Sequence, residues 1–361
     1  MKRIVLLGAT GSIGRSVCDV VRTHPKEFRI AALAVRHSLA AAESLGREFS
    51  AKVYSGEDSA VRAVEENDAD MAVVATVGLS GLLPTLAAIR KGMAVALATK
   101  EVLVAAGALV TAEARAHGVP LIPVDSEHSA IFQCIQGADA ARSISRLTLT
   151  ASGGPFLDRP ANLDDVTPAQ ALAHPRWSMG PKVTVDSSTM MNKGFEIIEA
   201  HWLFGVPLER IDVVVHPESI VHSLVEFEDG ATLAQLSPPD MRVPIQYALS
   251  WPRRLPAERV RLDLPTLSAL TFRAPDPCRF PALDLVRDAF REGGVRMAAL
   301  SAADEVAVER FLVGEIRYTD IVRLVADAVE RMPARPCDSV SAVLDADREA
   351  RALARAWSGQ G

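Results

Sequence analysis

RIVLLGATGSIG (Arg3–Gly14) joins an apolar run to three glycines at the spacing G-x-x-G-x-x-G. Arg3–Leu7 predicts a buried parallel strand, and the residues through Val21 predict the helix after it. The glycines allow a tight turn, and the helix N-terminus offers N–H groups to a pyrophosphate. A bare strand–helix turn is the alternative. The order of strand, glycine turn and helix favours a dinucleotide site.

The second predicted strand, Ile30–Val35, indicates which dinucleotide is bound. An NAD site usually has Asp or Glu at the end of this strand, where the carboxylate binds the ribose 2′-hydroxyl. Here Arg36, His37 and Ser38 follow instead. A cation with hydrogen-bond donors suits the 2′-phosphate of NADPH, whereas a solvated loop is the alternative.

The alternation of strands and helices continues to about residue 124. Ala69–Ala75, Ala94–Ala98 and Val119–Val124 predict strands, with helices between them. Repeated units of this kind predict an α/β fold with a Rossmann-like, doubly wound parallel sheet. Ligands of such sheets bind at the C-terminal ends of the strands. Four charged residues are predicted there: Lys100, Glu101, Asp125 and Glu127.

The second half of the chain has a different pattern. Asp229-Gly230 between two β-rich runs predicts a hairpin, and Ile211–Val215 predicts another strand. These strands indicate a second sheet, antiparallel or mixed, in a central α+β catalytic domain. We expect four segments: an NADPH-binding domain at 1–124, a catalytic domain with the metal and substrate residues at 125–250, a linker at 251–281 and a C-terminal helical domain at 282–361.

The stretch HPRWSMGPKVTVDSSTMMNKGFE (His174–Glu196) is dense in polar groups. Val183–Val185 predicts a short strand, and Asp186–Ser188 a turn and helix N-cap. On the following helix Asn192, Lys193 and Glu196 can converge, since positions three and four apart share a face. Together these groups suggest a site for phosphate and a metal. The alternative is a capped helix with an exposed Lys193–Glu196 pair.

Asp125 and Glu127 lie two residues apart, so on an extended segment their side chains point the same way. Two carboxylates on one side need a cation or a proton between them. A divalent ion with oxygen ligands fits, and Glu196 is a natural third ligand. The alternative is that Asp125 or Ser126 caps the helix near His128. After the next β-rich run, the loop Ala151–Pro155 could bring Ser152 and backbone amides to an anion.

Composition excludes several classes. The chain has 361 residues, 49% hydrophobic and 23% charged, with a formal net charge of −6. The absence of a basic excess argues against nucleic-acid binding. Four scattered cysteines suggest neither a zinc site nor disulfides, and no apolar run is long enough to span a membrane. A strand directly after Met1 leaves no room for a signal peptide, so we expect a cytoplasmic protein.

These motifs together carry a resemblance to a known family. The His174–Glu196 stretch, GATGSIG, VDSEHSAIFQ, ASGGPF and HPESIVHS…PPDMRVPI resemble 1-deoxy-D-xylulose 5-phosphate reductoisomerases, NADPH enzymes of the non-mevalonate isoprenoid pathway. The resemblance weakens after about Pro252. It implies rearrangement of 1-deoxy-D-xylulose 5-phosphate, then reduction by NADPH to 2-C-methyl-D-erythritol 4-phosphate. It also implies a homodimer, with a phosphorylated small molecule as substrate.

The resemblance assigns roles to matching residues. Asp125, Glu127 and Glu196 would hold Mg²⁺ or Mn²⁺, with Lys100 and Ser126 beside the reacting oxygens and His222 as a weaker catalytic candidate. Substrate contacts would come from Ser152, His174, Trp177, Met179, Ser187, Asn192 and Lys193. NADPH contacts would come from Thr10, Gly11, Ser12, Ile13, Thr99, Glu101 and Gly180, besides Arg36, His37 and Ser38.

The chain departs from the family pattern at several positions. The family usually has Asn at Thr99 and Asp304, Gly at Ala151 and Ser237, and a Gly and an Asn in the loop after Val35. None of these changes removes a proposed metal ligand or phosphate contact.

Two other functions stay open. One is another NADP-dependent dehydrogenase of a phosphorylated or acidic small molecule; a semialdehyde dehydrogenase would need a catalytic Cys beside a base. The other is a non-catalytic dinucleotide-binding protein, which needs no convergent carboxylates.

Overall fold

The computed structural model describes residues 1–137, 140–158, 162–177, 179–257 and 260–359. The chain forms two compact units. The first comprises Met1–Val102, Val110–Gln133 and Leu236–Asp263, and the second comprises Leu103–Leu109, Cys134–Gln235 and Leu264–Gly361. These units do not coincide with the four predicted segments, which divide the chain by function.

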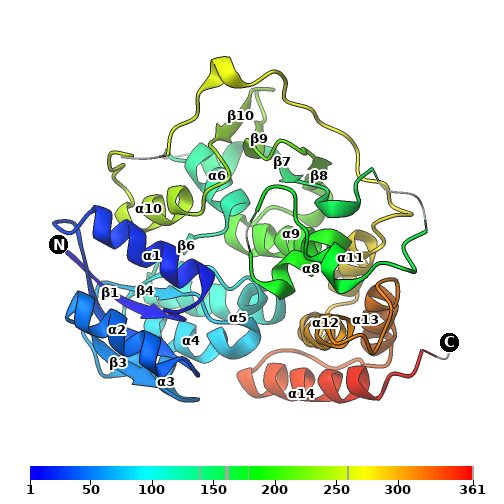
Figure 1. Ribbon diagram of the computed structural model, residues 1–361, viewed down its shortest axis with the longest axis horizontal. Coiled ribbons are helices and arrows are strands. Elements are labelled where there is room, and N and C mark those ends of the chain that lie inside the picture. The colour runs from blue at the N-terminus through cyan, green and yellow to red at the C-terminus, as the bar shows by residue number, and fades with distance from the viewer. Residues whose placement is uncertain (138–139, 159–161, 178, 258–259, 360–361) are drawn as a thin grey trace. The chain divides into compact units, whose positions relative to one another are not determined.

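The first unit contains a six-stranded parallel sheet with strand order β3-β2-β1-β4-β5-β6 (Figure 1). Its strands are β1 (Lys2–Leu7), β2 (Phe28–Val35), β3 (Lys52–Ser55), β4 (Met71–Val74), β5 (Ala94–Leu97) and β6 (Leu121–Pro123). Its helices are α1 (Ser12–Thr23), α2 (Leu39–Phe49), α3 (Ser59–Glu65), α4 (Leu82–Arg90), most of α5 (Glu101–His117), α6 (Ser126–Cys134, whose last residue belongs to the second unit) and α10 (Arg242–Ser250).

Helices cover both faces of this sheet. One face packs on α1 and α10 through Val17, Val21 and Ile245, while α3 and α4 pack on the other (Figure 1). The strand order reverses between β1 and β4, and ligands of such sheets bind at this switch point. The predicted Rossmann-like sheet is therefore confirmed. The four-residue edge strand β3 and helix α10 of the same unit had not been predicted.

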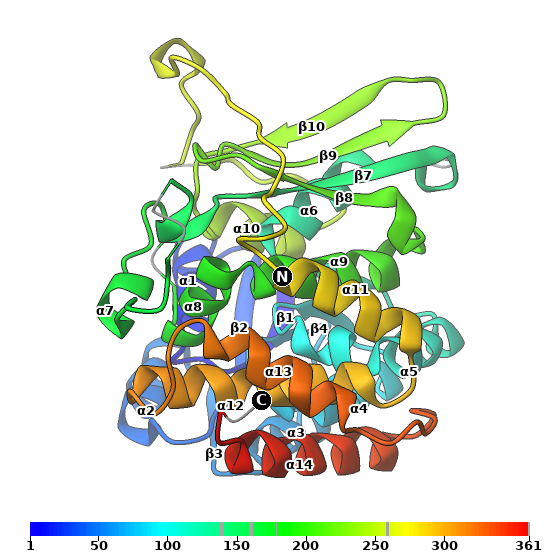
Figure 2. The same ribbon diagram turned by 90° about the vertical axis from the view of Figure 1, so that its right-hand side faces the viewer.

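The second unit contains a four-stranded mixed sheet with strand order β10-β9-β7-β8 (Figure 2). β7 pairs in parallel with β8 and antiparallel with β9, so the predicted mixed sheet is confirmed. Helix α9 packs against β7 and β8. The strands are β7 (Ile144–Ala151), β8 (Ile211–Val215), β9 (Val221–Phe227) and β10 (Thr232–Leu236).

The predicted strand at Val183–Val185 is wrong. Pro181–Thr189 forms helix α8, and a break at Met190 (φ 65°) separates it from α9, Met191–Phe204. Pro181 opens the helix, where its fixed φ fits and its missing N–H is not needed. Val185 is fully buried. Tertiary packing thus overrides the β-branched preference, and Asp186–Ser188 lies inside α8 rather than in a turn.

The C-terminal region is helical, as predicted. Helices α11 (Ala282–Glu292), α12 (Arg296–Leu312), α13 (Asp320–Glu330) and α14 (Val340–Ala356) pack mainly on one another, and the short α7 spans Pro168–Ala171 (Figure 2). Among the described residues, no helix has both the length and the apolar content needed to cross a bilayer.

Candidate active site

The glycine turn after β1 is shaped by close backbone packing. Gly8 has φ +85°, and a Cβ atom there would lie 2.2 Å from the Ala75 carbonyl oxygen. A Cβ at Gly14 would lie 2.3 Å from the Gly8 oxygen, whereas Gly11 leaves more room. Gly11 is the N-cap of α1 and no side chain caps this end. The free N–H groups of α1 therefore suit a pyrophosphate, and the turn fits a dinucleotide.

Arg36 follows β2 as predicted, but it already has a partner. Its guanidinium Nη2 lies 2.9 Å from Glu57 Oε1, and the two side chains are 60% and 82% exposed. An exposed pair of this kind is weak, so an anionic ligand can compete with Glu57 for Arg36.

Lys100 and Asp125 meet after the ends of the neighbouring strands β5 and β6. Lys100 Nζ lies 2.6 Å from Asp125 Oδ2, and both side chains are mostly buried. Asp125 Oδ1 accepts the backbone N–H of Glu127 at 3.1 Å and lies 3.0 Å from His128 Nδ1. Asp125 thus caps α6 and also binds a buried lysine. The capping alternative holds for its Oδ1 atom, while its second oxygen faces a cation.

His128 is a polar residue of this cluster that the sequence interpretation did not assign to the site. It is fully buried and contacts Asp125. Its position three residues after Asp125 on the first turns of α6 was the available signal, because residues at this spacing lie on one face of a helix.

Thr99 stands where the family usually has Asn. Its hydroxyl donates to the Thr76 carbonyl oxygen at 2.7 Å, which ties the loop after β5 to the loop after β4. With its proton used in this way, Thr99 offers a ligand an oxygen acceptor rather than a donor.

In the second unit, Ser152 is hydrogen-bonded to His174. The His174 Nδ1 atom accepts the backbone N–H groups of Arg176 and Trp177 at 3.1 and 2.9 Å. The ring proton therefore sits on Nε2, which donates to Ser152 Oγ at 3.0 Å. Burial lowers the pKa of His174 to about 4, so the ring is neutral at physiological pH. Ser152 Oγ also accepts the Gly154 N–H, which leaves its own proton for an anionic acceptor.

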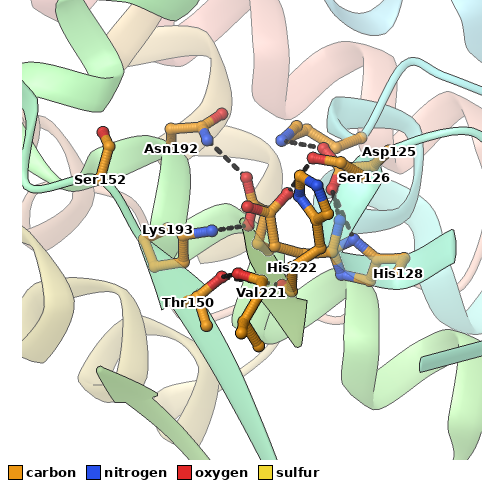
Figure 3. Close-up of polar contacts among 12 residues, drawn as sticks. Asp125, Ser126, His128, Thr150, Ser152, Asn192, Lys193, Val221 and His222 are labelled. Atoms are coloured by element: carbon orange, nitrogen blue, oxygen red, sulfur yellow. Dashed lines mark hydrogen bonds and ion pairs between the residues drawn. The ribbon is translucent and has the colours of Figure 1, made fainter. Parts of the chain in front are cut away.

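Asn192 and Lys193 lie close together on the first turn of α9 (Figure 3). Both side chains bind the carboxylate of Glu196 on the same helix. Lys193 is 4% exposed and Glu196 is 1% exposed. The pair is therefore buried, unlike the exposed pair of the alternative interpretation. Because a buried ion pair rarely increases stability over apolar packing, its presence favours a functional role.

The loop carrying Ser152 packs closely on α8. Gly154 has φ +63°, and a Cβ atom there would lie 3.0 Å from both the Ser187 carbonyl oxygen and the Ser188 Cα atom. A cavity of about 670 Å³ opens beside this loop, with Ser152, Gln170 and Arg176 among its lining residues. This volume is in the usual range for small-molecule sites.

The histidines of the second sheet differ. His222 on β9 is 3% exposed, and its ring lies 6.1 Å from the Trp177 ring. His216 donates to the Thr271 carbonyl oxygen, accepts the N–H groups of Ile220 and Val221, and stacks on Phe272. His216 therefore holds the β8–β9 connection, and only His222 stays a candidate.

A glycine turn at the switch point of a parallel doubly wound sheet, with charged side chains at the neighbouring strand ends, defines a dinucleotide-binding protein of the Rossmann type. Residues 4–55 and 38–107 match the family described as 1-deoxy-D-xylulose 5-phosphate reductoisomerase. Residues 121–204 and 236–353 match two C-terminal domains of that enzyme.

Curated relatives carry the same name. The protein from Ralstonia pickettii is 48% identical over 99% of this chain and 97% of its own length. The protein from Symbiobacterium thermophilum is 49% identical over 98% of both chains. The chain therefore belongs to the 1-deoxy-D-xylulose 5-phosphate reductoisomerase family.

Solved structures agree with this membership. A reductoisomerase in complex with NADPH, fosmidomycin and magnesium has a TM-score of 0.92 and 38% identity, over 99% of this chain and 98% of the other. The Zymomonas mobilis enzyme in complex with NADPH has a TM-score of 0.90 and 39% identity, over 98% of both chains.

Proposed function

We propose that this chain rearranges 1-deoxy-D-xylulose 5-phosphate and reduces the product with NADPH to 2-C-methyl-D-erythritol 4-phosphate. Family membership over nearly the whole chain carries the proposal. The reaction needs a dinucleotide, a divalent cation and a site for a phosphate group. The residues of each unit supply chemistry that suits these three needs.

NADPH binds at the glycine turn and at the strand ends beside it. The free N-terminus of α1 supports a pyrophosphate there, and Arg36 supports recognition of the 2′-phosphate. The proposed contacts are Thr10, Gly11, Ser12, Ile13, Arg36, His37, Ser38, Thr99, Glu101 and Gly180.

Asp125, Glu127 and Glu196 are the proposed metal ligands. Their oxygen-only donor set suits Mg²⁺ or Mn²⁺. Such an ion polarises carbonyl and hydroxyl oxygens and stabilises negative charge on them. Lys100 orients Asp125 through their 2.6 Å contact, and Asn192 and Lys193 orient Glu196. Ser126 donates to Glu127 Oε2 at 2.5 Å and so orders the second carboxylate.

The substrate phosphate binds to groups of the second unit. Neutral His174 keeps Ser152 Oγ as an acceptor of its Nε2–H, so the Ser152 proton points to the anion. Ser187, Asn192 and Lys193 complete this phosphate subsite. Trp177 and Met179 contact the substrate, Lys100 and Ser126 flank the reacting oxygens, and His222 is a further catalytic candidate.

We also propose that the segment from His174 to Pro181, of which Ser178 lies outside the described residues, acts as a lid over bound substrate. Its Trp177 and Met179 supply an apolar cover, and a Cβ atom added at Gly180 would meet nothing within 4 Å, so Gly180 has room to act as a hinge. Proteolysis near Trp177 should slow when NADPH and fosmidomycin are both bound, and equal cleavage with and without them would contradict the lid.

The other two functions have less support. Catalysis by cysteine needs a thiolate, but burial raises the pKa of Cys18 to about 11 and also raises that of Cys337. A protein that only binds nucleotides has no need of the buried Lys193–Glu196 pair.

We further propose that the protein is a cytoplasmic homodimer. In each chain, residues 1–124 bind NADPH, residues 125–250 hold the catalytic groups, and residues 282–361 form a helical domain. Residues 251–281 are the linker between the catalytic and helical domains.

One assay tests the activity. The purified chain should oxidise NADPH when 1-deoxy-D-xylulose 5-phosphate and Mg²⁺ are both present, followed at 340 nm, with 2-C-methyl-D-erythritol 4-phosphate as the product by mass spectrometry. Omission of the substrate or of the metal is the control. A protein that binds NADPH but never oxidises it with this substrate would contradict the proposal.

A further inference from the structure

Lys182, on the first turn of α8, connects three helices of the second unit. Its Nζ atom lies 2.6 Å from Asp186 Oδ2 on α8 and 3.0 Å from Asp304 Oδ2 on α12. The same ammonium lies 4.7 Å from the ring centroid of Phe195 on α9, within the range of a cation–π contact. Asp186, Asp304 and Phe195 are each at most 1% exposed. We name these four residues the Lys182 cluster.

The helices that meet at the Lys182 cluster carry the proposed phosphate contacts. Ser187 directly follows Asp186 on α8, and Lys193 comes two residues before Phe195 on α9. A rotation or shift of α8 against α9 would therefore move Ser187 away from Lys193. Because Gly154 packs closely on the Ser187 carbonyl, the same movement of α8 would also displace the loop that carries Ser152.

The composition of the cluster favours a positioning role over a purely stabilising one. Two buried carboxylates around one ammonium are costly to desolvate, and apolar side chains of similar size would often be as stable. Ion pairs, however, fix direction and distance, as apolar contacts do not. The charged arrangement thus defines how α8 sits on α9 and α12, at some expense of stability.

We infer that Lys182 is a positioning residue for the phosphate subsite, which it holds in shape by fixing α8 against α9 and α12. The inference rests on the proposed function, since that function assigns the phosphate to Ser152, Ser187, Asn192 and Lys193. Lys182 itself need not touch the ligand.

The test measures the affinity for inorganic phosphate by calorimetry. Lys182→Met alone would leave two buried carboxylates without their cation and is expected to unfold easily. The triple variant Lys182→Met, Asp186→Asn, Asp304→Asn removes all three charges and keeps the side-chain shapes. It should bind phosphate about ten- to a hundredfold more weakly than the wild type, since displacements of about 1 Å have effects of this size.

A matched control involves Glu305, the residue after Asp304 on α12. Arg351 on α14 lies between Glu305 on α12 and Asp347, at 2.7 and 2.8 Å, so it is also one cation between two carboxylates. The variant Arg351→Met, Glu305→Gln, Asp347→Asn removes the same number of charges and should leave phosphate affinity unchanged. The single variant Lys182→Arg keeps the cation and should retain most of the wild-type affinity for phosphate. Ser187→Ala shows how much affinity is lost with one direct phosphate contact.

Steady-state kinetics distinguishes a failure of this inference from a failure of the proposed function. In the triple Lys182 variant, the KM for the phosphorylated substrate should rise at least tenfold, with a smaller change in kcat and an unchanged Kd for NADPH. Equal phosphate affinity in the wild type and this variant, or a wild type that binds no phosphate, would overturn the inference. Failure of the proposed function would instead appear as a wild type that binds phosphate and NADPH but does not oxidise the cofactor.

Discussion

At the residue scale, His174 shows how burial selects one protonation state. Two backbone N–H groups point at Nδ1, so a proton on that atom would displace them. Desolvation acts in the same direction and lowers the pKa to about 4. The ring thus stays a neutral Nε2–H donor to Ser152 through the pH range, above about 6, in which the substrate phosphate is a dianion.

This low pKa predicts how stability depends on pH. In the unfolded chain His174 has its ordinary pKa of 6.5, and in the folded chain its pKa is about 4. Between these values the unfolded state holds more protons, so the free energy of unfolding should fall as pH falls from 6.5 to 4 and level off below. Urea unfolding at several pH values should show a shallower slope for His174→Gln than for the wild type. The same slope in both, with exposed His37→Gln as control, would contradict the low pKa.

Arg36 gives a second prediction at this scale. Arg36→Ala should lower the affinity for NADPH on the order of tenfold or more, because a charge-assisted contact typically contributes about 1.5–3 kcal/mol. The affinity for NADH should stay nearly unchanged. Glu57→Gln removes the carboxylate that competes for Arg36, so the affinity for NADPH should rise roughly two- to fivefold. Fluorescence titration measures both cofactors. An equal loss of NADPH and NADH in Arg36→Ala would exclude a role at the 2′-phosphate.

At the element scale, the loop after β7 predicts the behaviour of Gly154. An alanine there at φ +63° carries about 1–2 kcal/mol of backbone strain, and its Cβ would press on the Ser187 carbonyl of α8. Gly154→Ala should therefore lower stability by about that amount and also raise the KM for the phosphorylated substrate. Gly230→Ala at the hairpin tip, with φ +84° and nothing within 4 Å, is the matched control. If both variants lose stability and neither changes KM, the contact with α8 has no bearing on the substrate.

The elements differ in how well the sequence predicts them. The central strands of the first sheet are mostly apolar runs, so β1, β2, β4 and β5 followed from pattern alone. The edge strand β3 has only Tyr54 buried, so its pattern is weak. Helix α8 was mistaken for a strand because Val183, Thr184 and Val185 have β preference, while its helical state depends on packing that no local pattern contains.

The residues of the site also differ in how well the sequence predicts them. Residues at the ends of predicted strands, such as Lys100 and Asp125, could be grouped from topology, since neighbouring parallel strands end at one edge. The contact of Ser152 with His174 joins a strand end to a loop 22 residues later, and the sequence predicted both residues without the hydrogen bond between them. The Lys182 cluster depends on α12, more than a hundred residues away in the chain, which explains why no motif indicated it.

At the scale of the whole molecule, the proposed metal ligands come from distant segments. Asp125 and Glu127 stand at the start of α6, and Glu196 comes 69 residues after Glu127 on α9. Each carboxylate is held by its own neighbours: Asp125 by Lys100 and His128, Glu127 by Ser126, and Glu196 by Asn192 and Lys193. Such support is typical of ligands that are oriented before a metal binds.

The metal prediction follows from this donor set. Activity should vanish in a chelator and return with Mg²⁺ or Mn²⁺, because an all-oxygen set favours these hard cations. Glu196→Gln keeps the shape of the side chain and its contact with Lys193 through the amide oxygen, so the fold should survive while turnover collapses. Binding gives a readout without turnover: Mg²⁺ should raise the melting temperature of the wild type, since a ligand of the folded state stabilises it, and should not raise that of Glu196→Gln. Full activity in the chelator, or an equal Mg²⁺ shift in both proteins, would exclude Glu196 as a ligand and with it the proposed metal-assisted rearrangement.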